Sequence, residues 1–304
     1  MEPPLGVVPP PDRDAEPEGY VVVLDSGDRL HFLDWGGPGR DPGALLVHGL
    51  SQTGWIWAPV ARRLRAALPT VSLDLRGHGL SDAPTEAYAL EQLAADVVAV
   101  AEGAGLVADA NAQVVVAGHG FGAIVAAMGA IALGRRCAGL VLVDGGWEDL
   151  ERSTGVDVEE FLRGLDEPPE VLASMDAFLL DRAGFDPATW DADQERSARA
   201  TVVETHAGRV VPATRPHALE ACVRAMFEYD AKAVLARVEA PVVALVAAED
   251  ELGARRDALA AASAARTAAG HPAIAVAEFP GIGHNLMRYR PVEVSAAILA
   301  ARGL

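Results

Sequence analysis

Two residues that could do chemistry stand directly after runs of apolar residues. Asp250 ends the run "PVVALVAAED", and His284 lies in "FPGIGHNL", at the end of another such run. A histidine acts as a general base when an acid holds its ring in the right tautomer. We therefore predict that His284 is a base oriented by Asp250, with Asp144 at the end of "GLVLVD" as the alternative acid.

The stretch "VVVAGHGFGAIVAA", residues 114–127, reads as a strand, a sharp turn and a helix. The β-branched run favours a strand, and the pattern of small residues after the turn favours a helix. The turn is Gly-x-Gly-x-Gly with Gly120 at its centre. Because glycine has no side chain, the centre of this turn carries no nucleophile.

Short apolar runs alternate with helical patterns along most of the chain. Such an alternation indicates a parallel sheet covered by helices on both faces. We therefore predict an α/β fold with an eight-stranded, mostly parallel sheet, whose first two strands form an antiparallel hairpin through "DSGD" at one edge. The expected strands are "YVVVL", "LHFLDW", "ALLVHG", "TVSLDL", "QVVVAG", "GLVLVD", "PVVALVAA" and "AIAVAEFP".

The alternation is interrupted once, over residues 147–230. This stretch contains helical patterns, no strong strand and several large apolar residues. It is too long for an ordinary connection, so we predict a helical cap over the carboxyl ends of the strands, where such sheets bind ligands. The core would comprise residues 19–146 and 231–304, and the proline-rich, acidic residues 1–18 would form a flexible tail.

These features, in this order, resemble the α/β-hydrolase superfamily over nearly the whole chain after the tail. Residues 48–50, "HGL", resemble its oxyanion loop, residues 74–82, "DLRGHGLSD", resemble a signature loop, and residues 118–122, "GHGFG", stand where the nucleophile elbow G-x-S-x-G is found. The resemblance implies an α/β-hydrolase fold and a triad in the order nucleophile, acid, histidine. It also implies an oxyanion hole made by the backbone N–H groups of Leu50 and Phe121.

Gly120 takes the nucleophile position of that elbow, and three interpretations follow. In the first, the protein is a serine hydrolase whose nucleophile has been replaced. In the second, glycine is natural, and His284 with its acid is a general base on water or on an acidic substrate proton, in a hydrolase, a lyase or a cofactor-free oxygenase. In the third, the protein binds a ligand without turnover. The loop "HGLSQTGW" lacks the proline usual in the aspartate-type epoxide hydrolases, which favours the serine type.

Aromatic residues close to the predicted site indicate the substrate class. Trp55 and Trp57 follow the oxyanion loop, and Trp147 follows the sixth predicted strand. Together with the apolar cap, they predict a small, largely apolar substrate such as an ester or a lactone.

The other histidines are given structural roles. His119, beside the centre of the elbow, is expected to point away from the cleft, and His78 is expected to organise its own loop with Asp74. The remaining four are interpreted as structural: His31, His206, His217 and His271.

The composition disfavours several classes of protein. A net charge of −18 disfavours nucleic acids and anionic membranes as partners. Two cysteines are too few for a disulfide framework, and because no metal cluster, phosphate loop or dinucleotide fingerprint is present, we expect no cofactor and no metal. The N-terminus lacks a signal-peptide pattern, and no apolar run is long enough to cross a bilayer. We therefore expect a cytoplasmic protein whose partner is a small-molecule substrate.

Overall fold

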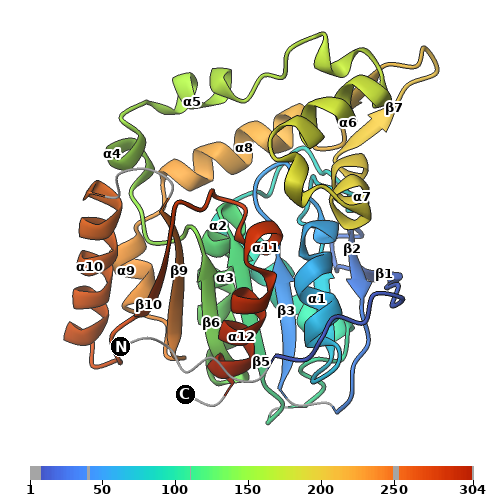
Figure 1. The fold of residues 1–304 in the computed structure, drawn as a ribbon. Helices are drawn as coiled ribbons and strands as arrows, with labels where there is room; N and C mark the ends of the chain where they lie inside the picture. Colours follow the sequence, from blue (N-terminus) through green and yellow to red (C-terminus); the bar gives the residue numbers. More distant parts are fainter. Residues whose placement is uncertain (1–7, 40–41, 110, 249–252, 303–304) are drawn as a thin grey trace.

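An eight-stranded sheet forms the centre of the protein (Figure 1). The computed structural model describes residues 8–39, 42–109, 111–248 and 253–302. The strand order is β1-β2-β4-β3-β5-β6-β9-β10, and β2 alone runs antiparallel to its neighbours. The predicted eight strands and the edge hairpin are thereby confirmed. The strands are β1 (Glu18–Val23), β2 (Arg29–Asp34), β3 (Gly43–Val47), β4 (Thr70–Leu73), β5 (Val114–His119), β6 (Cys137–Val143), β9 (Val242–Ala248) and β10 (Ala275–Pro280).

Helices cover both faces of this sheet. In β3, Leu45 and Val47 belong to the apolar cluster of one face, whereas Ala44 and Leu46 belong to the cluster of the other, as the two-residue period of a strand requires. The helices of the first face are α2 (Leu90–Gly103), α3 (Phe121–Leu133), α9 (Ala231–Leu235) and α10 (Gly253–Ala268). Those of the opposite face are α1 (Ala58–Leu64), α11 (Leu286–Tyr289) and α12 (Pro291–Ala301). No helix in the described ranges combines the length and the apolar character needed to span a bilayer.

The insertion between β6 and α9 lies over the carboxyl ends of the parallel strands (Figure 1). Asp157, Ser174 and Asp191 begin three of its helices, because each side chain accepts a backbone N–H from the first turn. A short antiparallel hairpin of β7 and β8, which the sequence did not predict, also belongs to the insertion. Its elements are α4 (Leu150–Thr154), α5 (Val158–Gly164), α6 (Met175–Gly184), α7 (Ala192–Ala200), β7 (Val202–Glu204), β8 (Val210–Pro212) and α8 (Pro216–Phe227).

The segment before β1 is held by Arg62 of α1 and by Arg65, directly after that helix. Arg62 donates to the carbonyl oxygens of Arg13, at 3.1 Å, and Ala15, and Arg65 forms a 2.8 Å ion pair with Asp12. Residues 12–15 are therefore tied to the core by these contacts, which differs from the flexible tail expected over 1–18. Residues 1–7 lie outside the described ranges.

Candidate active site

The turn between β5 and α3 requires glycine at positions 118 and 122 and favours it at position 120. Gly120 has φ 53° and ψ −117°, a conformation that costs glycine little and other residues more. A Cβ atom on Gly118 would lie 2.1 Å from the carbonyl oxygen of Gly122, and one on Gly122 would lie 2.2 Å from that of His48. Backbone packing on both sides of Gly120 therefore fixes the sharp turn.

His284 faces Gly120 from the loop between β10 and α11. A Cβ atom on Gly120 would lie 3.2 Å from Nε2 of His284 and 3.5 Å from its Cε1. Apart from chain neighbours, no other atom of the described residues would come within 4 Å of that position. The exposed imidazole of His284 therefore directs Nε2 at open space above Gly120.

The carboxylate that holds His284 is that of Asp144. Its Oδ2 lies 2.5 Å from Nδ1 of His284. Asp144 is the alternative acid predicted from the sequence, and the structure brings it to Nδ1 of His284. Asp250, the acid favoured by the sequence, lies outside the described residues, so that preference stays untested. β6, which leads to Asp144, pairs directly with the elbow strand β5, so Asp144 lies beside the elbow.

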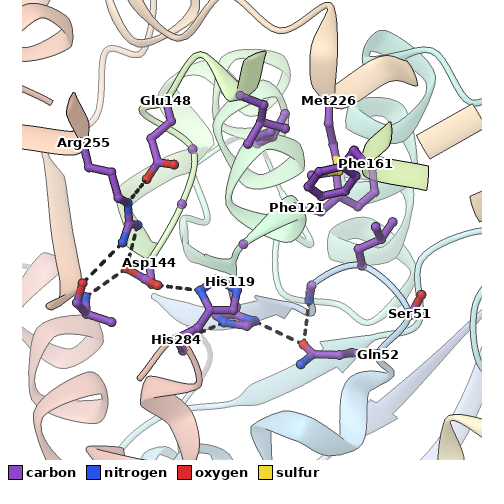
Figure 2. Close-up of a pocket in the computed structure, with 18 of the residues that line it drawn as sticks. Ser51, Gln52, His119, Phe121, Asp144, Glu148, Phe161, Met226, Arg255 and His284 are labelled. Atoms are coloured by element: carbon purple, nitrogen blue, oxygen red, sulfur yellow. Dashed lines mark hydrogen bonds and ion pairs between the residues drawn. The ribbon is translucent and has the colours of Figure 1, made fainter. Parts of the chain in front are cut away.

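An ion-pair network holds the second oxygen of Asp144 (Figure 2). Oδ1 accepts the backbone N–H of Ala247 at 2.9 Å and Nη2 of Arg255 at 2.8 Å. Nε of Arg255 donates to Oε1 of Glu148 at 2.6 Å. Burial opposes ionisation of Asp144, but hydrogen bonds and charges from His284 and Arg255 outweigh it and lower the pKa of this carboxyl. Asp144 therefore stays ionised, as the partner of a base must.

Glu148 and Arg255 were not predicted from the sequence, and the pKa of Glu148 shifts in the opposite direction to that of Asp144. Burial raises the pKa of Glu148 despite its ion pair with Arg255. Glu148 lies shortly after β6, and Arg255 lies in the first turn of α10, after β9. The signal in the sequence was a pair of opposite charges, one shortly after each of two adjacent parallel strands. It could have predicted the ion pair of Glu148 and Arg255.

His119 packs beside His284 and does not point away from the cleft as expected. The two ring centroids are 4.3 Å apart, and His119 lines the cavity next to Gly120. Nδ1 of His119 lies 3.2 Å from Oε1 of Gln52, and Nε2 lies 3.1 Å from the carbonyl oxygen of His284. Burial and the neighbouring His284 lower the pKa of His119 to about 3, so its neutral ring acts as a support for the His284 loop.

The backbone N–H groups of Leu50 and Phe121 are available at the cavity wall. Both residues line the cavity, and neither N–H donates a hydrogen bond to a group within the described residues. Phe121 is the first residue of α3, where the helix dipole favours negative charge. His48 fixes the loop before Leu50, because its Nδ1 bonds the carbonyl oxygen of Gly49 at 2.7 Å and its Nε2 accepts the N–H of Leu75 at 3.0 Å.

Asp74 organises the loop that follows β4. Its Oδ1 accepts the N–H of Gly54 at 2.7 Å, and its Oδ2 accepts that of Leu80 at 3.0 Å. Nδ1 of His31 lies 2.8 Å from the same Oδ2. His78 is fully buried and bonds the carbonyl oxygen of Arg76 at 3.1 Å. These contacts give Asp74, His31 and His78 structural positions.

A cavity of about 510 Å³ lies between Gly120 and the cap. Its floor includes Gly120 and His284, and its apolar wall includes Ile124 from the core and Phe161 and Met226 from the cap (Figure 2). Glu148 and Arg255 line the polar side of the cavity. The site thus combines an apolar chamber with the His284–Asp144 pair and two backbone N–H groups that have no partner among the described residues.

The three tryptophans predicted to bind substrate do not line this cavity. Trp57 and Trp147 are buried in the two apolar clusters of the core. Trp55 packs edge-on against Trp35, with ring centroids 5.8 Å apart, and the guanidinium of Arg196 lies 4.8 Å from its ring. Their proximity to the motifs in sequence therefore reflects core packing rather than substrate contact.

The curated proteins with similar sequences match only part of this chain. Mouse "Epoxide hydrolase 4" is 36% identical over 109 residues, which cover 35% of this chain and 29% of that protein. "N-formylmaleamate deformylase" of Pseudomonas putida is 39% identical over 85 residues, which cover 28% of this chain and 31% of that protein. The chain thus spans less than a third of the length of either curated relative.

Similarity of structure and of sequence profile extends much further. The crystal structure of E-2-(acetamidomethylene)succinate hydrolase superposes with a TM-score of 0.73 and 22% identity, over 93% of this chain and 97% of that one, which shows a shared fold. The sequence profile described as "Alpha/beta hydrolase family" matches residues 44–297. Because this match spans most of the chain, the protein belongs to the alpha/beta hydrolase family.

Proposed function

We propose that this protein is a hydrolase that cleaves a small, largely apolar ester or lactone without forming a covalent intermediate. One observation carries the proposal: Nε2 of His284 lies 3.2 Å from the position where a side chain on Gly120 would begin. A base is therefore aimed at the place where a nucleophile must stand. Since Gly120 offers no hydroxyl, the nucleophile is water.

The reaction follows from the groups around Gly120. The space left by the missing side chain has room for about one water, next to a polar partner in His284. Nε2 takes a proton from this water as its oxygen attacks the carbonyl carbon of the substrate, and the N–H groups of Leu50 and Phe121 stabilise the oxyanion. His284 then returns the proton to the alcohol oxygen as the C–O bond breaks, which releases an acid and an alcohol.

Asp144 serves this cycle by holding His284 in one tautomer. A neutral imidazole must keep its proton on Nδ1 so that Nε2 is free to accept one. The 2.5 Å contact with Asp144 favours that arrangement, and the ionised carboxylate stabilises the imidazolium that forms. Similarity to an epoxide hydrolase and to a deformylase supports hydrolytic chemistry, and the apolar side of the cavity supports an apolar substrate.

A panel of activated aryl esters and lactones tests the proposal, with intact-protein mass spectrometry during turnover. We expect hydrolysis that is lost in His284→Ala and retained in His206→Ala, a matched change at an exposed histidine of the cap. No acyl adduct should accumulate. An unchanged rate in His284→Ala, or an acylated protein, would contradict a general-base mechanism on water. Ligand binding without turnover of any ester would favour the non-catalytic interpretation.

A further inference from the structure

A second cavity, of about 600 Å³, adjoins the catalytic one under the cap. The two cavities share four lining residues: Ser51, Gln52, Leu165 and His284. His284 therefore stands at the boundary between two chambers. An ester also has two parts, and their junction must lie at His284 if the proposed function, on which this inference rests, is correct.

Aromatic rings paired with guanidinium groups form much of the wall of the second cavity. The guanidinium of Arg182 lies 4.8 Å from the ring centroid of Phe178, and that of Arg288 lies 5.8 Å from Trp190 and 5.6 Å from Tyr289. All five residues line this cavity. Flat aromatic and guanidinium surfaces favour a planar aromatic ligand, which can stack on either of them.

Arg288 brings to this wall a positive charge that no carboxylate of the described residues neutralises. Its Nε donates to Oγ1 of Thr189 and its Nη2 to the carbonyl oxygen of Asp186, both at 2.6 Å, which fixes the plane of the guanidinium. Within the described part of the chain, Nη1 has no hydrogen-bond partner and no carboxylate lies within ion-pair distance. Arg182, by contrast, is neutralised by Glu167.

The catalytic cavity has the opposite charge balance. Among the described residues that line it, Asp144 and Glu148 are acids, and Arg255 is the one arginine. With His284 neutral, ionisation of both acids leaves this chamber with one net negative charge. An anionic group is therefore repelled from the catalytic chamber and attracted to Arg288 in the second one.

We propose that the second cavity binds an aromatic group that carries a carboxylate, with Arg288 as its counter-ion. This group is the alcohol half of the substrate, because the acyl carbon must lie at the N–H groups of Leu50 and Phe121, which line the catalytic cavity and not the second one. The alcohol oxygen faces His284, which both cavities share. The neutral, apolar acyl half then occupies the catalytic cavity beside Phe161 and Met226. The substrate class is an apolar acyl ester of a hydroxylated aromatic carboxylate.

Two matched ligands test this site without requiring turnover. 4-Hydroxybenzoate and 4-hydroxybenzamide have the same shape and differ in charge, and isothermal titration calorimetry gives both dissociation constants. We expect the carboxylate to bind about tenfold more tightly, because a charge-assisted bond to a fixed guanidinium is worth that much. Arg288→Met should abolish this preference and change binding of the amide by less than about twofold.

Three further variants keep the test decisive. Arg290→Met, two residues further along and outside the cavity, should keep the preference. Arg288→Lys retains the charge and should keep part of the preference, whereas Glu167→Gln releases Arg182 from its ion pair and should increase the preference. Equal binding of the two ligands by the unmodified protein, or a preference that survives in Arg288→Met, overturns the proposal.

Ester substrates separate this inference from the proposed function. We expect kcat/KM for 4-carboxyphenyl acetate to exceed that for 4-carbamoylphenyl acetate about tenfold, with the difference lost in Arg288→Met. A preference seen in binding but no hydrolysis of either ester would refute the hydrolase proposal and leave the aromatic carboxylate site standing. Hydrolysis of both esters at equal rates, with equal binding, would refute the site and leave the hydrolase proposal standing.

Discussion

Nε2 of His284 and the α-carbon of Gly120 face each other across a gap that one small side chain would fill. A Cβ atom on Gly120 would lie 3.2 Å from Nε2, so a hydroxyl carried on that atom would be within hydrogen-bond reach of the base. The elbow backbone and the His284–Asp144 pair border this gap. On the proposed function, a hydroxyl at residue 120 would therefore stand where the nucleophile of a serine hydrolase does.

Gly120→Ser should therefore create a reactive serine. Its hydroxyl would give a proton to His284, so we expect the variant to react with a fluorophosphonate probe and to form an acyl adduct with activated esters, whereas the unmodified protein does neither. Intact-protein mass spectrometry detects both products. The positive φ of residue 120 should lower the free energy of unfolding by about 1 kcal/mol, after allowance for the greater unfolded-state entropy of glycine.

Gly120→Ala is the matched control for that experiment. Alanine introduces the same backbone strain and the same Cβ atom, but no nucleophile, so it should show the loss of stability without the labelling. Labelling of the alanine variant would place the reactive group elsewhere. A folded serine variant that stays unlabelled would mean that Nε2 of His284 is not available as a base.

Asp144→Asn tests which acid orients His284. The amide keeps the size of the side chain but loses the charge that stabilises the imidazolium, so kcat/KM should fall by about 10²–10⁴-fold while kinetics in Asp250→Asn stay close to those of the unmodified protein. Steady-state hydrolysis of one activated ester by the two variants is the measurement. The reverse pattern would restore Asp250 as the acid.

The sequence predicts the fold well and the site only in part, for identifiable reasons. Strands and helices follow from local periodicity, which is why every core strand was found. The choice between Asp144 and Asp250 depends on which side chain lies beside His284 in space, which local periodicity does not contain, and the structure brings Asp144 there. The burial of Trp57 and Trp147 likewise depends on which face of an element meets the core.

Arg255→Met tests the network behind the acid. The change leaves Glu148 buried without its counter-charge and removes one donor from Asp144, so the free energy of unfolding should fall by about 2–4 kcal/mol. The pKa of Asp144 should rise, since the charge of Arg255 helps to lower it. Urea unfolding measures the change in the free energy of unfolding, and the pH dependence of kcat/KM on the same samples measures the change in pKa.

Arg256→Met provides the control, because the neighbouring Arg256 forms an exposed pair with Glu278 at 2.6 Å. Exposed ion pairs contribute about 0–1 kcal/mol to stability, so Arg256→Met should change neither the free energy of unfolding nor kcat/KM appreciably. Glu148→Gln should cost less than Arg255→Met, since the amide oxygen still accepts from Nε of Arg255. If Arg255→Met and Arg256→Met have equal effects, the network does not support Asp144.

The buried neutral histidines should make folding sensitive to acid. Burial and the neighbouring His48 lower the pKa of His78 to about 3, although its bond to the carbonyl oxygen of Arg76 opposes the shift. Its pKa in the unfolded chain is about 6.5. A histidine with a depressed folded-state pKa contributes full stability above about pH 6.5, and that contribution falls as the pH drops toward 3, by about 1.4 kcal/mol per pH unit.

His78→Asn isolates this contribution. The amide nitrogen of asparagine can still donate to the carbonyl oxygen of Arg76, but it does not titrate. We therefore expect His78→Asn to be less stable than the unmodified protein, by an amount that does not change with pH above about 7.5. Between pH 6.5 and 4 this difference in stability should shrink by about 1.4 kcal/mol per pH unit. Glu148 and Asp96, whose raised pKa values act in the opposite direction, are present in both proteins and cancel in the difference. Urea unfolding at several pH values supplies the curves, with exposed His206→Asn as the control. Parallel curves for His78→Asn and the unmodified protein would show that His78 does not carry the acid sensitivity.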